Sequence, residues 1–472
     1  MVNISPRRSG REGSSTICLV SHISLDNYSN HVSATSQQCS CSSRCIRRFH
    51  IAPYADGYRK EILHRMQTYI STDEHSNAPV EFCFGGDGPD YISMPESKIK
   101  VKFKITHADN TSSVLIEDEV AVPVNLALHS LFSQVDVTLG GRLMTPATAM
   151  YPYKSFIQTL LNYGTDAKES QLISQGWYQE EGEDMNKVTV LGNAAVKRKH
   201  DLFAESKTVD FEGPLLEDVF QINRFLINNV EVKVKLYPTH AEFFIMSVTA
   251  DKKYKVVLED IILKVCMVRV SPGVILGHAK ALETRNSLYP YTRVETKAFS
   301  IAKGTHTINL DNVFQQARPS RIVFGLVSAA AFNGDLKLNP FKFHHYNVTD
   351  IAVIVNGETV PGRPLQKKFG QEGGRDFISS YLALFEATGR SGTDFGNALK
   401  PKEFADGHTL FAFNLDPEFK KGKYLNLVKR ANVRIELRFS TPLPETVNVV
   451  VYAEHPSLFE VDLARNVIVT QN

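Results

Sequence analysis

The stretch KIKVKFKI, residues 98–105, alternates lysine with an apolar residue at every position. Successive side chains of a β-strand point to opposite faces of the sheet, so this alternation predicts a strand with one wet face and one buried face. A second stretch, RIVFGLV at residues 321–327, has the same opening of Ser, a basic residue and Ile, and is more apolar. We interpret the two stretches as equivalent strands in two copies of one fold.

Other segments recur in the same order on either side of the middle of the chain. Each copy has a strand that ends in a tight turn and is followed by a proline and then by apolar residues at helical spacing. The strand pairs are VDVTL (135–139) with IAVIV (351–355), NVEVKVKL (229–236) with NVRIELRF (432–439), and DIILKVCMV (260–268) with ETVNVVVY (445–452). The turns are Gly140-Gly141 and Asn356-Gly357, the prolines are Pro146 and Pro361, and the helical faces are Phe156, Leu160 and Tyr163 in the first copy and Phe377, Tyr381, Leu384 and Phe385 in the second. We expect Val234 and Ile435 at buried positions of equivalent strands.

These patterns predict an all-β protein with two tandem eight-stranded jelly-roll β-sandwiches and short helices in the loops between strands. The first sandwich is predicted at residues 66–275 and the second at residues 276–472, with the junction in the proline- and glycine-containing stretch 271–291. Residues 1–65 are rich in Ser and Arg and have little hydrophobic periodicity. They are interpreted as a disordered basic arm, or as an extension of the gene prediction.

The composition excludes several classes of protein. Hydrophobic residues make up 43% and charged residues 22% of the 472 positions, which is typical of a folded, water-exposed domain. No apolar run approaches the about 18 residues of a membrane-spanning helix, so no span is predicted. The net charge of +2, from 53 basic and 51 acidic side chains, argues against binding nucleic acid over the whole surface. Six cysteines in this length do not indicate a disulfide scaffold.

A few clusters have the residue types of a chemical site, and each also has a plainer interpretation. Trp177 and Tyr178 precede the acidic run 180–184, which predicts a solvated loop or, alternatively, a sugar subsite. Cys39, Cys41, Cys45 and His50 could bind zinc, but their spacing matches no common closed site. KRKH at residues 197–200 predicts a solvated loop, with a nuclear localisation signal or a DNA contact as the alternative.

The remaining candidates favour structural roles. GGDG at residues 85–88 is followed by Pro89 and no helix pattern, so a loop leading into a strand is favoured over a nucleotide site. His344 and His345 are placed at the edge of a strand, where alternation would point their rings apart and prevent a shared metal. Cys83 and Cys266 are flanked by apolar strand residues and are predicted to be core thiols. No catalytic, cofactor-binding or metal-binding residue is therefore assigned, and the chain is not predicted to be an enzyme.

Several long segments resemble the hexon-type major capsid proteins of Maverick/Polinton elements and adintoviruses, which also occur as genes in animal genomes. The segments are GDGPDYI (86–92), PVNLALHSLFSQVD (123–136), YPY (151–153) through LLNYG (160–164), TLFAFN (409–414) and LPETVNVVVYAE (443–454). Met94, after Tyr91-Ile-Ser, departs from the acidic residue and Leu expected there, and residues 1–65 have no counterpart.

The resemblance implies a major capsid protein with a double jelly roll that forms trimeric, pseudo-hexagonal capsomers of an icosahedral DNA virus or virus-like element. It implies no cofactor and no catalytic residues. Its implied partners are further copies of the chain, penton and minor capsid proteins, and packaged DNA at the basic N-terminal segment. Its implied location is the virion, with assembly in the host nucleus or cytoplasm. The alternative functions are a jelly-roll carbohydrate-active hydrolase and a lectin-like binding module.

Overall fold

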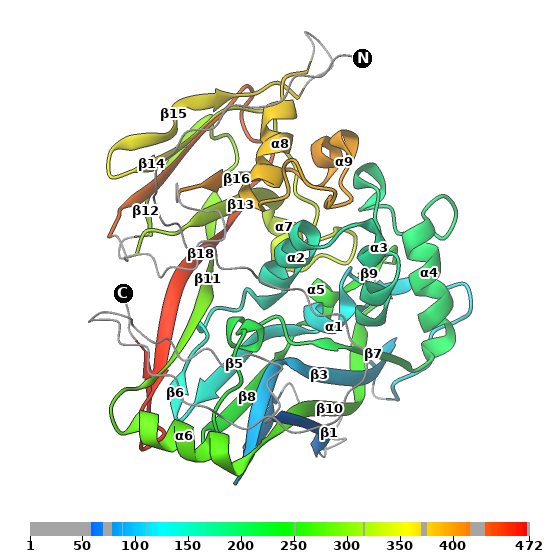
Figure 1. Cartoon of the computed structure of the whole chain (residues 1–472). Helices are drawn as coiled ribbons and strands as arrows, with labels where there is room; N and C mark the ends of the chain where they lie inside the picture. Colours follow the sequence, from blue (N-terminus) through cyan, green and yellow to red (C-terminus); the bar gives the residue numbers. More distant parts are fainter. Residues whose placement is uncertain are drawn as a thin grey trace, which may run out of the picture. The chain divides into compact units, whose positions relative to one another are not determined.

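The computed structural model describes residues 58–68, 78–86, 88–109, 111–249, 252–314, 317–369, 375–415 and 430–469 (Figure 1). For residues 58–68 only the backbone is described. The strands of the first half are β1 (Tyr58–Thr68), β2 (Val80–Gly85), β3 (Asp90–His107), β4 (Ala121–Pro123), β5 (Phe132–Leu139), β6 (Arg142–Leu143), β7 (Val209–Pro214), β8 (Glu231–Pro238), β9 (Ile245–Ser247) and β10 (Tyr254–Val270). The strands of the second half are β11 (Ser287–Ile301), β12 (Thr307–Phe314), β13 (Arg321–Ser328), β14 (Val348–Val355), β15 (Glu358–Gln366), β16 (Leu410–Asn414), β17 (Val433–Phe439), β18 (Val447–Val461) and β19 (Val467–Val469).

The helices lie in the connections between strands. The α-helices are α1 (Ala127–Ser130), α2 (Tyr151–Asn162), α3 (Thr165–Lys168), α4 (Ala194–Phe203), α5 (Ala241–Phe244), α6 (Pro272–Leu282), α7 (Ala329–Asn333), α8 (Ile378–Ala387) and α9 (Pro401–Asp406). The 3-10 helices are η1 (Gln171–Gln175), η2 (Gly182–Asp184), η3 (Ala204–Ser206) and η4 (Asp218–Gln221). Within the part of the chain described, no helix is long and apolar enough to span a membrane.

The two halves have the same sheet topology. In the first half, sheet A has the order β1-β10-β3-β7 and sheet B the order β2-β8-β5-β6, while β4 and β9 form a separate pair. In the second half, sheet D has the order β11-β18-β13-β16, with β19 on β18, and sheet E the order β12-β17-β14-β15. Leaving out β4, β9 and β19, each half has eight strands, which we number 1 to 8 along the chain. In both halves one sheet then has the order 1-8-3-6 and the other the order 2-7-4-5. This is the double Greek key of a jelly roll, present twice.

The predicted strand equivalences are confirmed by this order. The stretches at 98–105 and 321–327 lie in β3 and β13, the third strand of each roll, and those at 229–236 and 432–439 lie in β8 and β17, the seventh. Val234 in β8 and Ile435 in β17 are 1% and 0% exposed, as predicted. The helical faces predicted after the turns lie in or beside α2 and α8, which both connect a fifth strand to a sixth.

The start of the first roll differs from the expected start at residue 66. Strand β1 begins at Tyr58, where it pairs with Val270 of β10, so part of the predicted arm belongs to sheet A. Alternation in this strand is too irregular to reveal it, and a register shift between Lys60 and Leu63 interrupts the pairing. The predictions for residues 1–57 lie outside the described residues.

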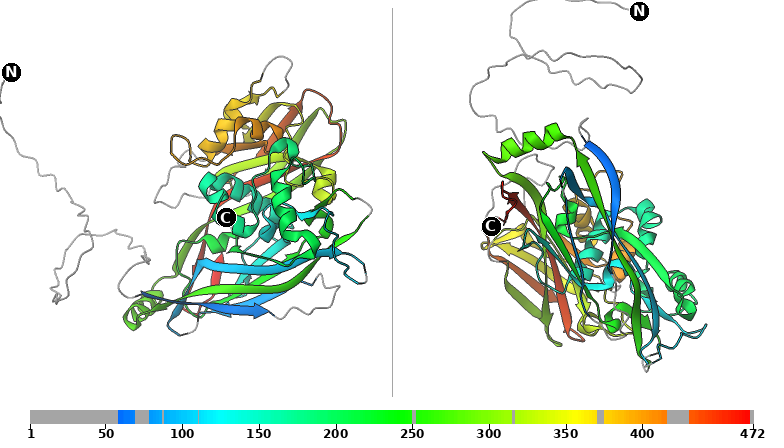
Figure 2. Two further views of the ribbon diagram at one scale, coloured as in Figure 1. Left: turned by 90° about the vertical axis from the view of Figure 1, so that its right-hand side faces the viewer. Right: turned by 90° about the horizontal axis from the view of Figure 1, so that it is seen from below.

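The connection between the rolls is a helix. Helix α6 follows β10 and precedes β11, and the two views of Figure 2 show it beyond the end of the β10 ribbon. Pro272 occupies the start of the helix, where its missing N–H costs no hydrogen bond. The proposed boundary at residues 275 and 276 falls inside α6, and it remains a prediction.

Candidate functional site

In sheet D, strand β13 is apolar on both faces from Ile322 to Val327, and this property creates the contact between the two rolls. In β13, Ile322, Phe324 and Leu326 lie in the core of the second sandwich. Val323 and Val327, which point the other way, belong to the core cluster that also fills the first sandwich. Strands buried on both faces have continuous apolar sequences, which explains why RIVFGLV lacks the alternation of KIKVKFKI. The outer face of sheet D is therefore one side of the contact between the rolls.

Helix α2 supplies much of the other side. Residues 151–161 of this helix are all buried, because it packs against β5 of its own roll and against β11 and β18 of the second roll. The Phe156 ring stacks on Phe341 with the ring centroids 4.3 Å apart, and Tyr153 stacks on Phe332 at 5.3 Å. Aromatic pairs of this kind stabilise a fold by more than the burial of their apolar area alone. The contact is thus packed like a protein core.

A buried ionic cluster lies within this contact. The Lys154 Nζ atom is 2.5 Å from Glu217 Oε2 and 2.9 Å from Asp218 Oδ1, and the three side chains are between 3% and 6% exposed. Asp218 Oδ2 also accepts a hydrogen bond of 2.8 Å from the backbone N–H of Val294 in β11. The cluster therefore joins α2 and η4 of the first roll to the first strand of the second.

The protonation of the cluster follows from its burial. Burial raises the pKa of Glu217 to about 7 against the opposing attraction of Lys154, and the Asp218 carboxylate adds to the rise. Burial alone would lower the pKa of Lys154, but the carboxylates of Asp218 and Glu217 outweigh it and raise that pKa. A proton on Glu217 leaves Lys154 and Asp218 as a balanced pair of charges.

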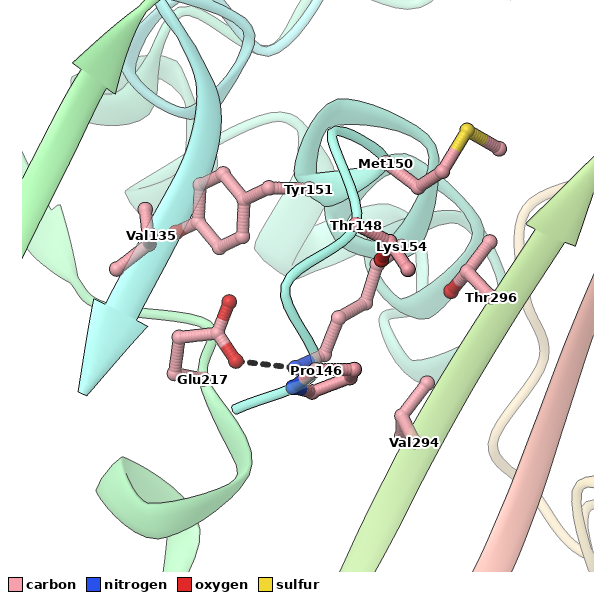
Figure 3. A pocket seen from close by; sticks show the side chains of 9 residues that line it. All are labelled: Val135, Pro146, Thr148, Met150, Tyr151, Lys154, Glu217, Val294 and Thr296. Carbon is pink, nitrogen blue, oxygen red and sulfur yellow. Dashed lines mark hydrogen bonds and ion pairs between the residues drawn. The ribbon is translucent and has the colours of Figure 1, made fainter. Parts of the chain in front are cut away.

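A small cavity opens beside the cluster (Figure 3). It is lined by Val135, Pro146, Thr148, Met150, Tyr151, Lys154, Glu217, Val294 and Thr296. The Thr296 hydroxyl is buried and has no protein partner. The cavity has room of about 10 Å³, which is enough for about one water molecule. A water molecule in this cavity would hydrate the ion pair.

Two other buried lysines also join the rolls. Lys199 in α4 pairs with Glu180 at 2.6 Å, and the other oxygen of Glu180 accepts a hydrogen bond of 3.0 Å from Asn339 of the second roll. Lys168 in α3 donates to the backbone oxygens of Leu160 at 2.9 Å and of Asn397 at 2.6 Å. Burial lowers the pKa of Lys168 to about 7. The segment between β6 and β7 thus contributes three lysines that bond, directly or through a carboxylate, to the second roll.

We compared this architecture with known proteins. No protein-family model matches the sequence. An uncharacterised protein of Caenorhabditis elegans is 28% identical over 405 residues, which cover 84% of this chain and 94% of the relative. The structure is similar to the Sputnik virophage structure, with a TM-score of 0.57 and 9% identity, covering 90% of this chain and 92% of that chain. The fold is a double jelly roll.

Two other solved structures support the same fold. A chain of the PBCV-1 virus capsid matches with a TM-score of 0.54 and 10% identity over 90% of this chain and 100% of that chain. The Faustovirus major capsid protein matches with a TM-score of 0.50 and 10% identity over 87% and 92%. At such identities the likeness establishes that this double jelly roll shares its fold with major capsid proteins.

Trp177 and Tyr178 are buried in the double jelly roll and do not form an exposed surface on which a sugar could stack. Their exposed fractions are 1% and 7%, because Trp177 packs on Phe156 and Lys168. The expectation of a solvated loop is wrong for Glu180 as well, since it is buried in its pair with Lys199. Residues 180–184 do not line the cavity beside Lys154. Glu180 instead serves as the buried partner of Lys199.

Other candidates also have structural explanations. KRKH at residues 197–200 lies in α4 rather than in a solvated loop, and Lys199 points inward to Glu180. The loop interpretation of residues 85–88 is confirmed for its described residues, since β2 ends at Gly85 and β3 begins at Asp90. A Cβ on Gly86 would lie 2.2 Å from the Asp90 carbonyl oxygen, so this turn requires glycine. The zinc candidate at residues 39–50 lies outside the described residues.

The histidine and cysteine predictions were partly wrong. His344 and His345 precede the turn at Tyr346 and Asn347 that leads into β14, and their rings stack with centroids 4.4 Å apart instead of pointing apart. Burial lowers the pKa of His345 to about 3, so this side chain is neutral. Cys83 is exposed on the outer face of β2 and donates to Glu231, whereas Cys266 is buried as predicted. Among the described residues, no group of three His, Cys, Asp or Glu side chains could hold a metal ion.

Proposed function

We propose that the chain is a major capsid protein that forms trimeric, pseudo-hexagonal capsomers of an icosahedral DNA virus or virus-like element. The observation that carries this proposal is the repetition of one eight-strand order in two rolls that share a packed contact. The fold shared with major capsid proteins supports it. The segments that resemble the Maverick/Polinton and adintovirus proteins favour that lineage.

The geometry suits a lattice subunit for a physical reason. Two similar rolls in one chain supply two corners, so three chains around a three-fold axis supply six near-equivalent corners. The rolls must keep one relative orientation for neighbouring capsomers to meet, and the apolar contact with its buried lysines fixes that orientation. A net charge near zero also limits repulsion among many copies.

The proposal extends to partners and location. Further copies of the chain would be the main partner, and penton and minor capsid proteins would complete the shell. The basic N-terminal segment could contact packaged DNA, since arginines there would neutralise phosphates. The protein would reside in the virion, and assembly would occur in the host nucleus or cytoplasm.

Light scattering on the purified full chain tests this function. A capsomer-forming protein is expected to have three times the chain mass of 52.8 kDa at micromolar concentration. A protein that is strictly monomeric over that range would contradict the proposal.

A further inference from the structure

The outer faces of sheets A and D correspond residue by residue but differ in chemistry. Ser97, Lys98 and Ile99 align with Ser320, Arg321 and Ile322, and Ile99 and Ile322 are both core residues opposite the eighth strand. This register places Lys100, Lys102, Lys104 and Asp260 of sheet A at the positions of Val323, Gly325, Val327 and Val450 of sheet D. The same face is ionic at Lys100, Lys102 and Lys104 in the first roll and apolar from Val323 to Val327 in the second, where the ion pair of Arg321 with Glu454 lies at the start of β13.

The ionic face of sheet A is partly exposed. Lys100 pairs with Asp210 at 2.7 Å, with side chains 26% and 56% exposed, and Lys104 pairs with Glu259 at 3.0 Å. A face that must remain in water before assembly requires such charges, whereas the matching face of sheet D is covered as soon as the chain folds. Sheet A is thus the counterpart of an interface: in the described part of the chain its outer face carries ion pairs, where sheet D carries apolar residues that pack against the first roll.

Helix α8 of the second roll is the counterpart of α2 of the first roll. It follows the fifth strand of its roll as α2 does, and its sequence ISSYLALFEA is strongly apolar. Nevertheless only Ser380 and Leu384 of this helix are buried, and Leu382 is 50% exposed. The helix contacts β16 and α9 of its own roll, whereas α2 is covered by both rolls. Within the described residues, the main contacts of α8 are therefore with its own roll, and its other side carries the exposed Leu382.

We propose that the outer face of sheet A packs against the α8 face of the second roll in a neighbouring copy of the chain. This interchain contact would repeat the contact that sheet D makes with α2 inside the chain. Contacts of this kind are head-to-tail, and six rolls joined in this way close into a ring of three chains. The inference rests on the proposed function and assigns the surfaces that build the trimer.

The two surfaces fit each other chemically. Lys100 and Lys104 of β3 pair with Asp210 and Glu259, so their aliphatic stems can cover an apolar side chain such as Leu382 while each ammonium group keeps its carboxylate partner. An interface that forms between soluble chains is expected to be more polar than the contact inside one chain.

Substitution of one surface at a time tests the assignment. Leu382→Arg places a charge on the exposed side of α8, and Leu191→Arg is a matched control on a first-roll loop where the side chain is 90% exposed. We expect the control to remain trimeric and Leu382→Arg to become monomeric by light scattering, with unchanged circular dichroism and melting temperature. A Leu382→Arg protein that remains trimeric would overturn the inference and leave the proposed function standing. A monomeric wild-type protein would instead contradict the function itself.

Mixing two variants gives a result that misfolding cannot produce. Lys102→Glu alters sheet A and leaves α8 intact, while Leu382→Arg does the reverse. Each variant alone is expected to be monomeric, but the mixture retains one good pair of surfaces and should form dimers of one chain of each kind. A mixture that shows no dimer would contradict the head-to-tail contact.

Discussion

Lys154 lies where an apolar helix of the first roll meets a strand of the second, and its ammonium group pairs there with the carboxyl groups of Glu217 and Asp218. Burying an ion pair gains little free energy, but removing one partner leaves a charge without compensation. We therefore predict that Lys154→Ala lowers the free energy of unfolding by about 3–5 kcal/mol. Lys187→Ala breaks an ion pair whose lysine is 65% exposed, and should cost about 1 kcal/mol or less. Urea denaturation of both variants measures these costs, and equal losses would contradict the assignment.

Glu217 makes the stability depend on pH. Its pKa is raised from 4.5 to about 7 in the folded chain, so the folded state binds more protons than the unfolded state between these values. The contribution is complete below about pH 4.5 and is lost as the pH rises to about 7, by about 3 kcal/mol at most. Glu217→Gln should weaken this dependence. Melting temperatures between pH 5 and pH 8 test it, and parallel curves for the two proteins would contradict the prediction.

Strand β8 allows a test of which of its side chains point into the core of the first sandwich. Val234 is 1% exposed and points into the first sandwich, opposite Phe82 and Val137 on the neighbouring strands. Val234→Asp should destabilise the fold by several kcal/mol, because an unpaired carboxylate cannot be accommodated in an apolar core. Lys233→Ala, on the solvent side of the same strand, should change the unfolding free energy by about 0.5 kcal/mol or less. A stable, assembling Val234→Asp protein would show that the register is wrong.

Strands were predictable from the sequence where local periodicity determines the structure. The alternation in β3, β8 and β17 and the turns after β5 and β14 identified equivalent elements, because period two and positive-φ turn residues are local signals. The buried lysines were not predictable in this way. Lys199 is buried because Glu180 lies beside it in the fold, and a run of basic residues gives no sign of that partner. A lysine within the apolar stretch YPYKSFIQTLL was the available signal for Lys154.

The predicted side-chain directions are wrong where the sequence places the start of a strand before its true position. His344 and His345 were expected to alternate, but β14 begins only at Val348, after Tyr346 and Asn347 adopt positive φ angles of 44° and 52°. The Nδ1 atoms of His344 and His345 accept hydrogen bonds from the backbone N–H groups of Tyr346 and Asn347, at 3.0 and 2.9 Å, and the two rings stack in this arrangement. Cys83 is a simpler case, because the burial pattern of β2 alternates strictly and this position falls on the exposed face.

At the scale of the whole molecule, the two rolls have one topology and different surfaces. Strand β13 of sheet D is apolar outside as well as inside from Ile322 to Val327, whereas the matching face of sheet A is charged. This difference determines which contact forms within the chain and which is left for another copy. This difference between the two faces is present in the sequence as the contrast between RIVFGLV and KIKVKFKI. Its consequence for assembly can be inferred only when the structure shows what packs against each face.

The central claim is that three copies of the chain build one capsomer with six corners. Electron microscopy of the purified full chain tests it most directly, because a three-fold particle with a hexagonal outline is easily distinguished from a single double jelly roll. The account predicts such particles, with both rolls of each chain in the ring. A field of monomers, or particles with two-fold symmetry, would contradict it.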